Sequence, residues 1–156
     1  MVFKSSKQEE IFNKVKSYLK EIFGEVNLTI KDQYIFGTRG TTCWRVEAVP
    51  INEEDLWIII EDYVTVDTPI RGELLRWLLD KQKYFWLGKF SIEPNKNDPF
   101  KCSIFLSHTM LGSTLDKKEL MLAVDFISSL ADKYDEEITK CFGGLTFKEW
   151  YLSQQK

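Results

Sequence analysis

The sequence predicts an α+β fold, a mainly antiparallel sheet packed against helices. The expected order is one helix, three strands, a second helix, two strands and a long helix, followed by a short helix near the C-terminal end. The hydrophobic period is helical at the start, alternates over several stretches and returns to helical at the end. Connections between the strand-like stretches are too short for parallel crossovers, except where the second helix intervenes. A chain of 156 residues can bury a core without a metal or disulfide, so we expect residues 1–156 to form one domain, with residues 145–156 as an extension.

The first helix is expected from about Lys7 to Phe23. Ser6 is placed to cap it with Glu9 in a capping box, and Gly24 follows as a stop. Its apolar side chains recur on one stripe, at Ile11, Val15, Tyr18, Leu19 and Ile22.

Three strands are expected next, at Val26 to Phe36, Trp44 to Pro50 and Leu56 to Val66. The third is apolar at four successive positions, 57–60, which is typical of a central strand. Residues 37–40 have the Gly-x-x-Gly spacing of a phosphate-clamping loop. That loop joins two helices, whereas both flanks here are strand-like, so a hairpin turn is the better interpretation.

A second helix follows, for which Thr68 is the expected cap and Pro69 the first residue. Its apolar face comprises Leu74, Leu75, Leu78 and Leu79. Two further strands are expected, Tyr84 to Ile92 and Phe100 to His108, joined by a Pro- and Asn-rich hairpin loop.

The long last helix is expected to begin after Asp116, with Glu119 three residues on, and to end at Gly143. Thr146 and Glu149 repeat the capping-box spacing, so a short C-terminal helix is predicted to fold back on the core.

Composition excludes several classes of protein. The 21 basic residues are interleaved with 24 acidic ones, for a net charge of -3, which argues against nucleic-acid binding. No apolar run approaches the ~20 residues of a membrane span, and the first residues lack the apolar core of a signal peptide, so we expect a cytoplasmic protein. The three cysteines are far apart, which indicates reduced thiols, with Cys102 on the apolar side of a strand.

Catalytic and cofactor-binding patterns are missing. His108 is the one histidine, and only Ser107 and Thr109 stand beside it, so a strand-end structural or surface role is favoured over catalysis. Ligand spacings for zinc or calcium do not occur, and we expect no cofactor. The acidic groups at residues 53–55 and 132–136 are interpreted as solvated surface.

The predicted sheet has more large apolar side chains than one covered face needs. The first and third helices are expected to cover Ile58, Ile60, Trp86, Phe90, Ile92, Phe100, Cys102, Ile104 and Leu106. The alternate positions are Trp57, Ile59, Tyr63, Phe85, Leu87 and Phe105, which are our candidates for a protein-binding surface. Either the second helix folds over them or a partner covers them.

The order of the elements and four short segments form a pattern known from a protein family. The segments are residues 74–79, 85–90, 132–137 and 142–144. The chain resembles the type III secretion chaperone-like fold shared by the YbjN family, most evidently between residues 74 and 144. Asp80-Lys81-Gln82 replaces the asparagines frequent in that helix, and the extension at 145–156 lies outside the pattern. The resemblance implies a cytoplasmic homodimer that binds an extended segment of a client polypeptide without enzymatic activity.

Two classes of function follow. The first is a non-enzymatic chaperone or adaptor that binds another polypeptide, as a homodimer, through a sheet face or a strand edge. The alternative is a small enzyme or small-ligand-binding protein whose site is assembled from residues distant in sequence. A deep pocket holding His108 with a carboxylate favours the alternative, and a broad apolar groove favours the first.

Overall fold

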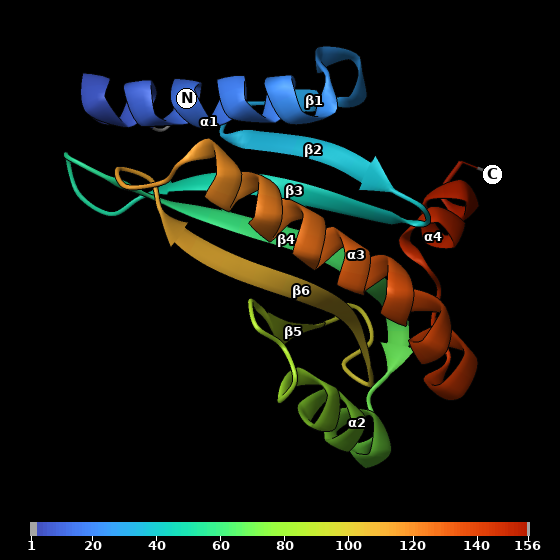
Figure 1. The fold of residues 1–156 in the computed structure, drawn as a ribbon. Coiled ribbons are helices and arrows are strands. Elements are labelled where there is room, and N and C mark those ends of the chain that lie inside the picture. The colour runs from blue at the N-terminus through green and yellow to red at the C-terminus, as the bar shows by residue number, and fades with distance from the viewer. Residues whose placement is uncertain (1–2, 156) are drawn as a thin grey trace.

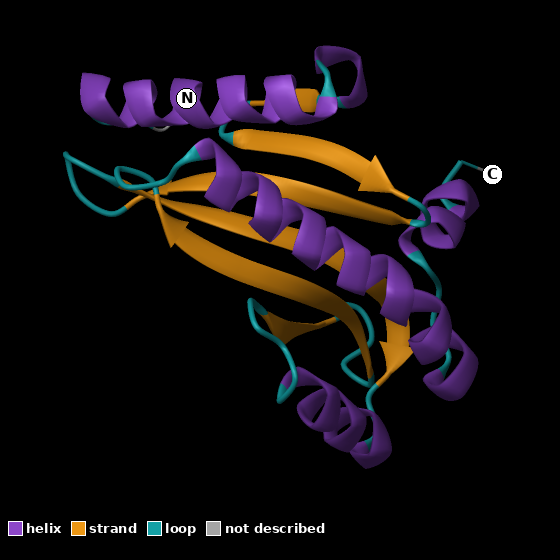
Figure 2. Cartoon of the chain, in the orientation of Figure 1, coloured by secondary structure: helices purple, strands orange, loops and turns teal. Residues whose placement is uncertain are grey.

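A computed structural model describes residues 3–155 of the chain (Figures 1 and 2). Its sheet is built from β1 to β6, and the helices lie before, between and after the strands. The bounds along the chain are α1 (Ser6–Phe23), the 3-10 turn η1 (Glu25–Asn27), β1 (Thr29–Lys31), β2 (Tyr34–Arg39), β3 (Thr42–Pro50), β4 (Leu56–Pro69), α2 (Gly72–Gln82), β5 (Lys89–Pro94), β6 (Lys101–Leu111), α3 (Lys117–Phe142) and α4 (Phe147–Ser153).

The strands form a single antiparallel sheet in the order β1-β2-β3-β4-β6-β5. The α+β class and the antiparallel sheet are therefore confirmed. The first predicted strand is divided into β1 and β2 by a turn at residues 32–33, where Asp32 has a φ of 53°. Its predicted start is also lost, because residues 25–27 form η1 and leave Val26 94% exposed. Within residues 3–155, none of the helices has an apolar stretch long enough for a membrane crossing.

The helices α1 and α3 lie on one face of the sheet, with α3 running diagonally across it in Figure 1. The side chains between these layers are fully buried, among them Leu19 of α1, Ile127 of α3 and Ile60 of β4. Strand residues alternate between this core and the opposite face, as the pleat of a strand requires. Helices α1 and α3 therefore cover one face, as predicted.

Helix α2 packs in the same layer as α3, at the β5 edge of the sheet. Leu74 and Leu78 are buried there, and the Trp77 ring lies edge-on to Tyr134 of α3, with ring centroids 5.5 Å apart. The second helix therefore does not cover the opposite face. The sequence left two explanations for the apolar residues of that face, cover by the second helix or by a partner, and cover by the second helix is excluded.

Most helix ends follow their predicted capping chemistry. Asp116 Oδ1 accepts a hydrogen bond from the Glu119 amide at 2.8 Å, and α3 ends at Gly143, as expected. Thr146 and Glu149 form the predicted capping box of α4. At α1 the prediction is off by one residue, since Ser5 is the cap and accepts from the Gln8 amide at 3.2 Å.

The start of the second helix was predicted too early. Thr68 and Pro69 belong to β4, which continues to Pro69 through two register shifts against β6. The Thr68 and Thr65 hydroxyls hydrogen-bond each other at 2.7 Å, and Asp67 between them has a φ of 55°. These irregularities carry the strand past the predicted cap, and α2 begins only at Gly72.

The fifth strand was also predicted to begin too early. Residues 84–88 form a turn in which Gly88 has a φ of 74°, and β5 begins at Lys89. As a result Trp86, expected to point inward, is 91% exposed, and Phe100, just before β6, is 80% exposed. The other seven residues of the inward set face the helices or pack against the core.

The segment at residues 37–40 is part of a hairpin, as predicted. Arg39 pairs with Thr42 across the turn, and Gly40 adopts a φ of 53°. A Cβ on Gly40 would lie 1.8 Å from an Asp132 carboxylate oxygen, so α3 packs directly on this turn.

Candidate functional site

The open face is the face of the sheet turned away from α1, α2 and α3. It carries the side chains that alternate with the core residues along β2, β3, β4 and β6. Its apolar members are Tyr34, Phe36, Val49, Trp57, Ile59, Tyr63, Phe105 and Leu111.

One end of the open face presents large apolar side chains to solvent. Trp57 is 42% exposed and pairs with Leu111 of β6 on one side and with Val49 of β3 on the other. Ile59, two residues further along β4, is half-buried and points to the same face. Such a cluster of apolar groups in water is typical of a surface that another molecule covers.

A charged pair lies in the middle of the face. Arg45 Nη2 and Nε donate to Glu61 Oε2 at 2.5 and 2.8 Å, and the two residues are direct neighbours on β3 and β4. The Arg45 guanidinium also lies 5.8 Å from the ring of Tyr34. Both side chains of the pair are half-buried, so the pair is held in a fixed position between two apolar areas.

The far end of the face is aromatic and is partly covered by α4. Tyr63 and Phe105 are paired across β4 and β6, and their ring centroids are 4.5 Å apart. Phe147 of α4 packs on the other side of Tyr63 at 5.2 Å. The predicted folding back of the C-terminal helix on the core is therefore confirmed, and the surface it uses is the open face.

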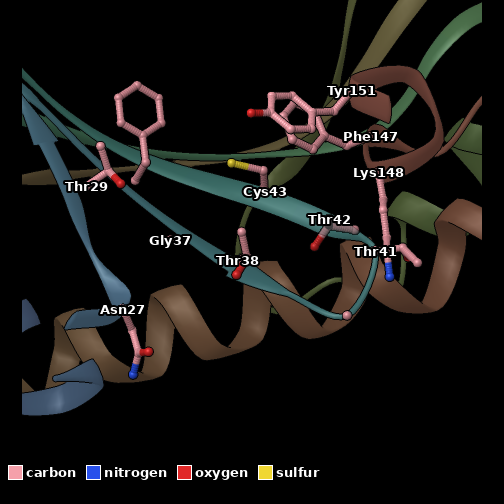
Figure 3. Close-up of a pocket in the computed structure, with 12 residues that line it drawn as sticks. Asn27, Thr29, Gly37, Thr38, Thr41, Thr42, Cys43, Phe147, Lys148 and Tyr151 are labelled. Carbon is pink, nitrogen blue, oxygen red and sulfur yellow. The ribbon is translucent and has the colours of Figure 1, made fainter. Parts of the chain in front are cut away.

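Two hollows flank α4 on this face. The first, of about 550 Å³, lies between α4 and β2 and β3 and is lined by Phe36, Thr38, Cys43, Lys148 and Tyr151, among others. Figure 3 shows the Cys43 side chain in this hollow, which Phe147 and Tyr151 of α4 also line. Burial raises the pKa of the Cys43 thiol to about 11, so it stays protonated and poorly nucleophilic.

The second hollow, of about 390 Å³, lies on the other side of α4, toward the loop between β5 and β6. Its lining includes Tyr63, Phe105, Ser103 and Trp150, together with Asn95 of that loop. Asn95 Nδ2 donates to Asp67 Oδ1 at 2.7 Å, which ties the loop to the end of β4.

Four of the six candidate residues lie on the open face and two do not. Trp57, Ile59, Tyr63 and Phe105 share that face on adjacent strands, as the alternation of β4 and β6 predicts. Phe85 instead packs on the helix side, with its ring 5.1 Å from Phe90 and 6.1 Å from Tyr134.

Leu87 is half-buried in the turn before β5. The placement of Phe85 and Leu87 on a strand was wrong, because the turn that ends at Gly88 removes the alternation on which it depended.

The sequence interpretation missed three residues of this site: Phe36, Cys43 and Phe147. The first two occupy the open-face positions of β2 and β3, in phase with Arg45, and the same alternation would have found them. Phe147 had no comparable signal, because its contact with Tyr63 joins segments far apart in the chain.

The one histidine lies away from the open face. His108 is half-buried on the helix side of β6, where burial lowers its pKa and Glu119 acts in the opposite direction. It lines neither of the two hollows. Among residues 3–155 the structure has no grouping of three or more His, Cys, Asp or Glu side chains suited to a metal ion.

The acidic residues of α3 are not all solvated, contrary to expectation. Asp135 is fully buried and accepts a hydrogen bond from the Thr41 hydroxyl, and Asp132 Oδ1 accepts from the Thr41 amide at 3.1 Å. Burial raises the pKa of Asp135 and, more strongly, that of the nearby Asp62 on β4. These carboxyl groups hold α3 against the β2–β3 turn on the side away from the open face.

Comparison with known proteins gives a family match in the C-terminal part of the chain. Residues 100–149 match the family TY-Chap1, described as T3SS (YopN, CesT) and YbjN peptide-binding chaperone 1. The matched segment contains β6, α3 and the start of α4. It reaches residue 149, so part of the extension that we placed outside the family pattern lies within it.

A relative was also found in Aquifex aeolicus (strain VF5), an uncharacterized protein that is 28% identical over 106 residues. The alignment covers 68% of this chain and 42% of that protein, so the chain spans about two fifths of the length of this relative. The match of residues 100–149 confirms the resemblance that the order of elements indicated: this part of the chain is similar to the YbjN and type III secretion peptide-binding chaperones.

Proposed function

We propose that this protein is a non-enzymatic chaperone or adaptor that binds an extended segment of another polypeptide on its open face, and that it works as a cytoplasmic homodimer. The observation that carries this proposal is the uncovered apolar area around Trp57, on a sheet whose three longest helices all lie on the other side. We also infer that residues 1–156 act together as one domain. The family match supports a peptide-binding role.

The area around Trp57 has the chemistry of a polypeptide-binding surface. Trp57 offers a large rigid side chain, and Leu111 and Val49 flank it on the neighbouring strands. Aromatic anchors of this kind contribute most of the binding free energy in many protein interfaces. Their full burial by a partner is worth about 1.5–3 kcal/mol for each large apolar side chain.

A strand edge next to the first hollow adds backbone groups for an extended partner. β1 pairs only with residues 34–36 of β2, so residues 37–39 extend beyond it at that edge. Thr38 in this stretch also lines the first hollow. A peptide that pairs with this edge gains main-chain hydrogen bonds while its side chains reach the hollow, which is the mode called β-augmentation.

The homodimer is proposed to use the outer face of α2 and the β5 edge. Leu79 is 69% exposed and Leu75 is 40% exposed, and both border a shallow apolar hollow of about 290 Å³ that Phe90 and Ile92 complete. An isologous dimer is the commonest way for a chain to cover such a patch.

The binding role is tested with a library of short fluorescent peptides of varied sequence, screened by fluorescence anisotropy. Peptides that bind the wild-type protein are then measured against Trp57→Asp and against Leu122→Asp, a control at an exposed leucine of α3. We expect Trp57→Asp to weaken binding about tenfold or more, because a charge in a desolvated contact is costly, and Leu122→Asp to leave it unchanged. Equal affinities for both variants would rule out the open face around Trp57 as the binding surface.

A further inference from the structure

The C-terminal helix α4 lies on the open face, between the two hollows. On one side Tyr151 and Lys148 line the first hollow, and on the other side Trp150 lines the second. Phe147 is packed on Tyr63 between them. A segment of the chain itself therefore lies between the two hollows.

The residues under and beside α4 form a row across the sheet. Thr38 pairs with Cys43, and Tyr63 pairs with Phe105, which pairs with Ser91 of β5. Cys43 and Tyr63 each lie one position beyond the Trp44–Asp62 pair, so they are neighbours on the open face. Five strands at a spacing of about 4.8 Å make this row about 19 Å long, which is the length of roughly six extended residues.

The attachment of α4 to this row is limited. None of its seven residues is fully buried, and a helix of this length has little stability by itself. It is anchored at its start, where Leu145 and Val66 exchange two backbone hydrogen bonds of 2.8 Å and the Lys148 amide donates to the Thr41 carbonyl at 3.1 Å. Gly143 and Gly144, both at positive φ, connect it to α3.

We propose that α4 is a built-in competitor for a client segment. It covers the middle of the row from Thr38 to Ser91, and an extended peptide carrying an aromatic residue in the place of Phe147 covers Tyr63 and Phe105 when α4 moves aside. The aromatic requirement follows from the surface itself, because Tyr63 and Phe105 present ring faces and edges to whatever covers them. This inference rests on the proposed peptide-binding role and extends the bound segment from the area around Trp57 to the far end of the open face, where the partner needs an aromatic residue.

The native cysteines report on the position of α4 without labels. Cys43 is half-buried beneath α4, Cys141 is exposed on α3, and Cys102 is buried in the core. Iodoacetamide labelling followed by peptide mass spectrometry therefore measures the accessibility of all three cysteines in one experiment. Cys43 follows the cover provided by α4, Cys141 serves as the internal standard, and Cys102 detects unfolding.

The first experiment compares the wild-type chain with Phe147→Ser, which removes the aromatic anchor, and with Thr146→Ala, which weakens the helix through its cap. We expect Cys43 labelling about tenfold faster in Phe147→Ser, since each unit by which exposure lowers a thiol pKa raises the thiolate fraction tenfold. A smaller increase is expected in Thr146→Ala, with Cys102 protected in both. Unchanged Cys43 labelling in both variants overturns the proposal.

The second experiment supplies the anchor in trans, as a synthetic peptide with the sequence of residues 145–155. We expect it to slow Cys43 labelling in Phe147→Ser and to bind that variant more tightly than the wild-type chain, where the tethered α4 competes at high effective concentration. The same peptide with serine at the phenylalanine position is the matched control and should have no effect. Equal effects of the two peptides, or equal binding to both proteins, contradict the competition.

The two proposals fail in different ways. If library peptides bind the wild type and Phe147→Ser equally well, peptide binding stands and the competition by α4 is wrong. If no library peptide binds either protein while the peptide 145–155 still protects Cys43 in the variant, α4 has a site of its own and the chaperone role is wrong.

Discussion

Thr42 Oγ1 donates a hydrogen bond of 3.2 Å to Asp62 Oδ2 beneath α3, while Asp62 Oδ1 has no hydrogen-bond partner within the described residues. The Asp62 side chain is fully buried, and burial raises its pKa well above the ordinary 3.8. The neighbouring Asp132 and Asp135 raise this pKa further. The folded chain therefore holds the proton on Asp62 more tightly than the unfolded chain does.

This difference predicts a pH-dependent stability that Asp62→Asn removes. The stabilisation from the raised pKa is fully present below pH 3.8 and is lost as pH rises through the folded-state pKa. Between these limits it declines by at most about 1.4 kcal/mol per pH unit. We expect Asp62→Asn to gain stability relative to the wild type as pH rises from about 4 to 8. Urea denaturation across this range measures the difference, and parallel curves would contradict the prediction.

Replacement of Phe85 by Asp is expected to damage the fold rather than a binding surface. The Phe85 ring packs against Phe90 and Tyr134, so a carboxylate there loses these contacts and is poorly solvated. We expect a loss of about 3 kcal/mol or more in the free energy of unfolding, measured by urea denaturation. Trp57→Asp, at a site 42% exposed, is the comparison and should change it by less than about 1 kcal/mol. Similar losses in both variants would place Trp57 in the core as well.

Gly144→Ala is expected to destabilise the junction between α3 and α4. Gly144 has a φ of 94°, and a Cβ there would lie 2.4 Å from Thr68 Oγ1 and 2.9 Å from Thr68 Cα. We expect a cost of about 1–3 kcal/mol from strain and close contact, visible as a lower midpoint in thermal denaturation. Gly72→Ala is the control, because nothing lies within 4 Å of the added Cβ and alanine favours a helix. A midpoint unchanged in Gly144→Ala would mean that the junction moves freely.

The proposed dimer predicts a different result for Leu79→Asp. This residue is 69% exposed on α2, so the isolated chain tolerates the charge, whereas an interface built on it does not. We expect analytical ultracentrifugation to show a dimer for the wild-type chain and a monomer for Leu79→Asp, with Leu122→Asp remaining dimeric. A wild-type monomer at micromolar concentrations would exclude the dimer.

Much of the fold was predictable because local signals determine it. The stripe of α1, the Asp116 cap of α3 and the capping box of α4 each depend on residues a few positions apart. The errors lie where a tertiary contact overrides the local signal. Thr68 is of a residue type that often caps a helix. Its carbonyl, however, accepts a hydrogen bond from Cys102 Sγ, and Thr68 pairs with Cys102 of β6, which keeps it in the strand.

The candidate site was predictable where its residues lie on strands and not where they lie in turns or on α4. Trp57, Ile59 and Tyr63 follow from alternation on a central strand, since a pleat fixes which residues share a face. Phe85 was misplaced because no local rule distinguishes a strand from a turn with strand-like composition. The contact between Phe147 and Tyr63 depends on where the chain returns after α3, and a single sequence does not contain that information.

The ion pair of Arg45 and Glu61 restricts the register in which an extended segment can bind to the open face. Along β4 the outward side chains recur about every 7 Å, and Glu61 falls between Ile59 and Tyr63. An apolar residue placed over the pair would desolvate two charges without replacing their contacts with water. A segment lying along β4 therefore needs apolar residues on either side of a polar one, so that a shift by one position places the wrong chemistry against every contact.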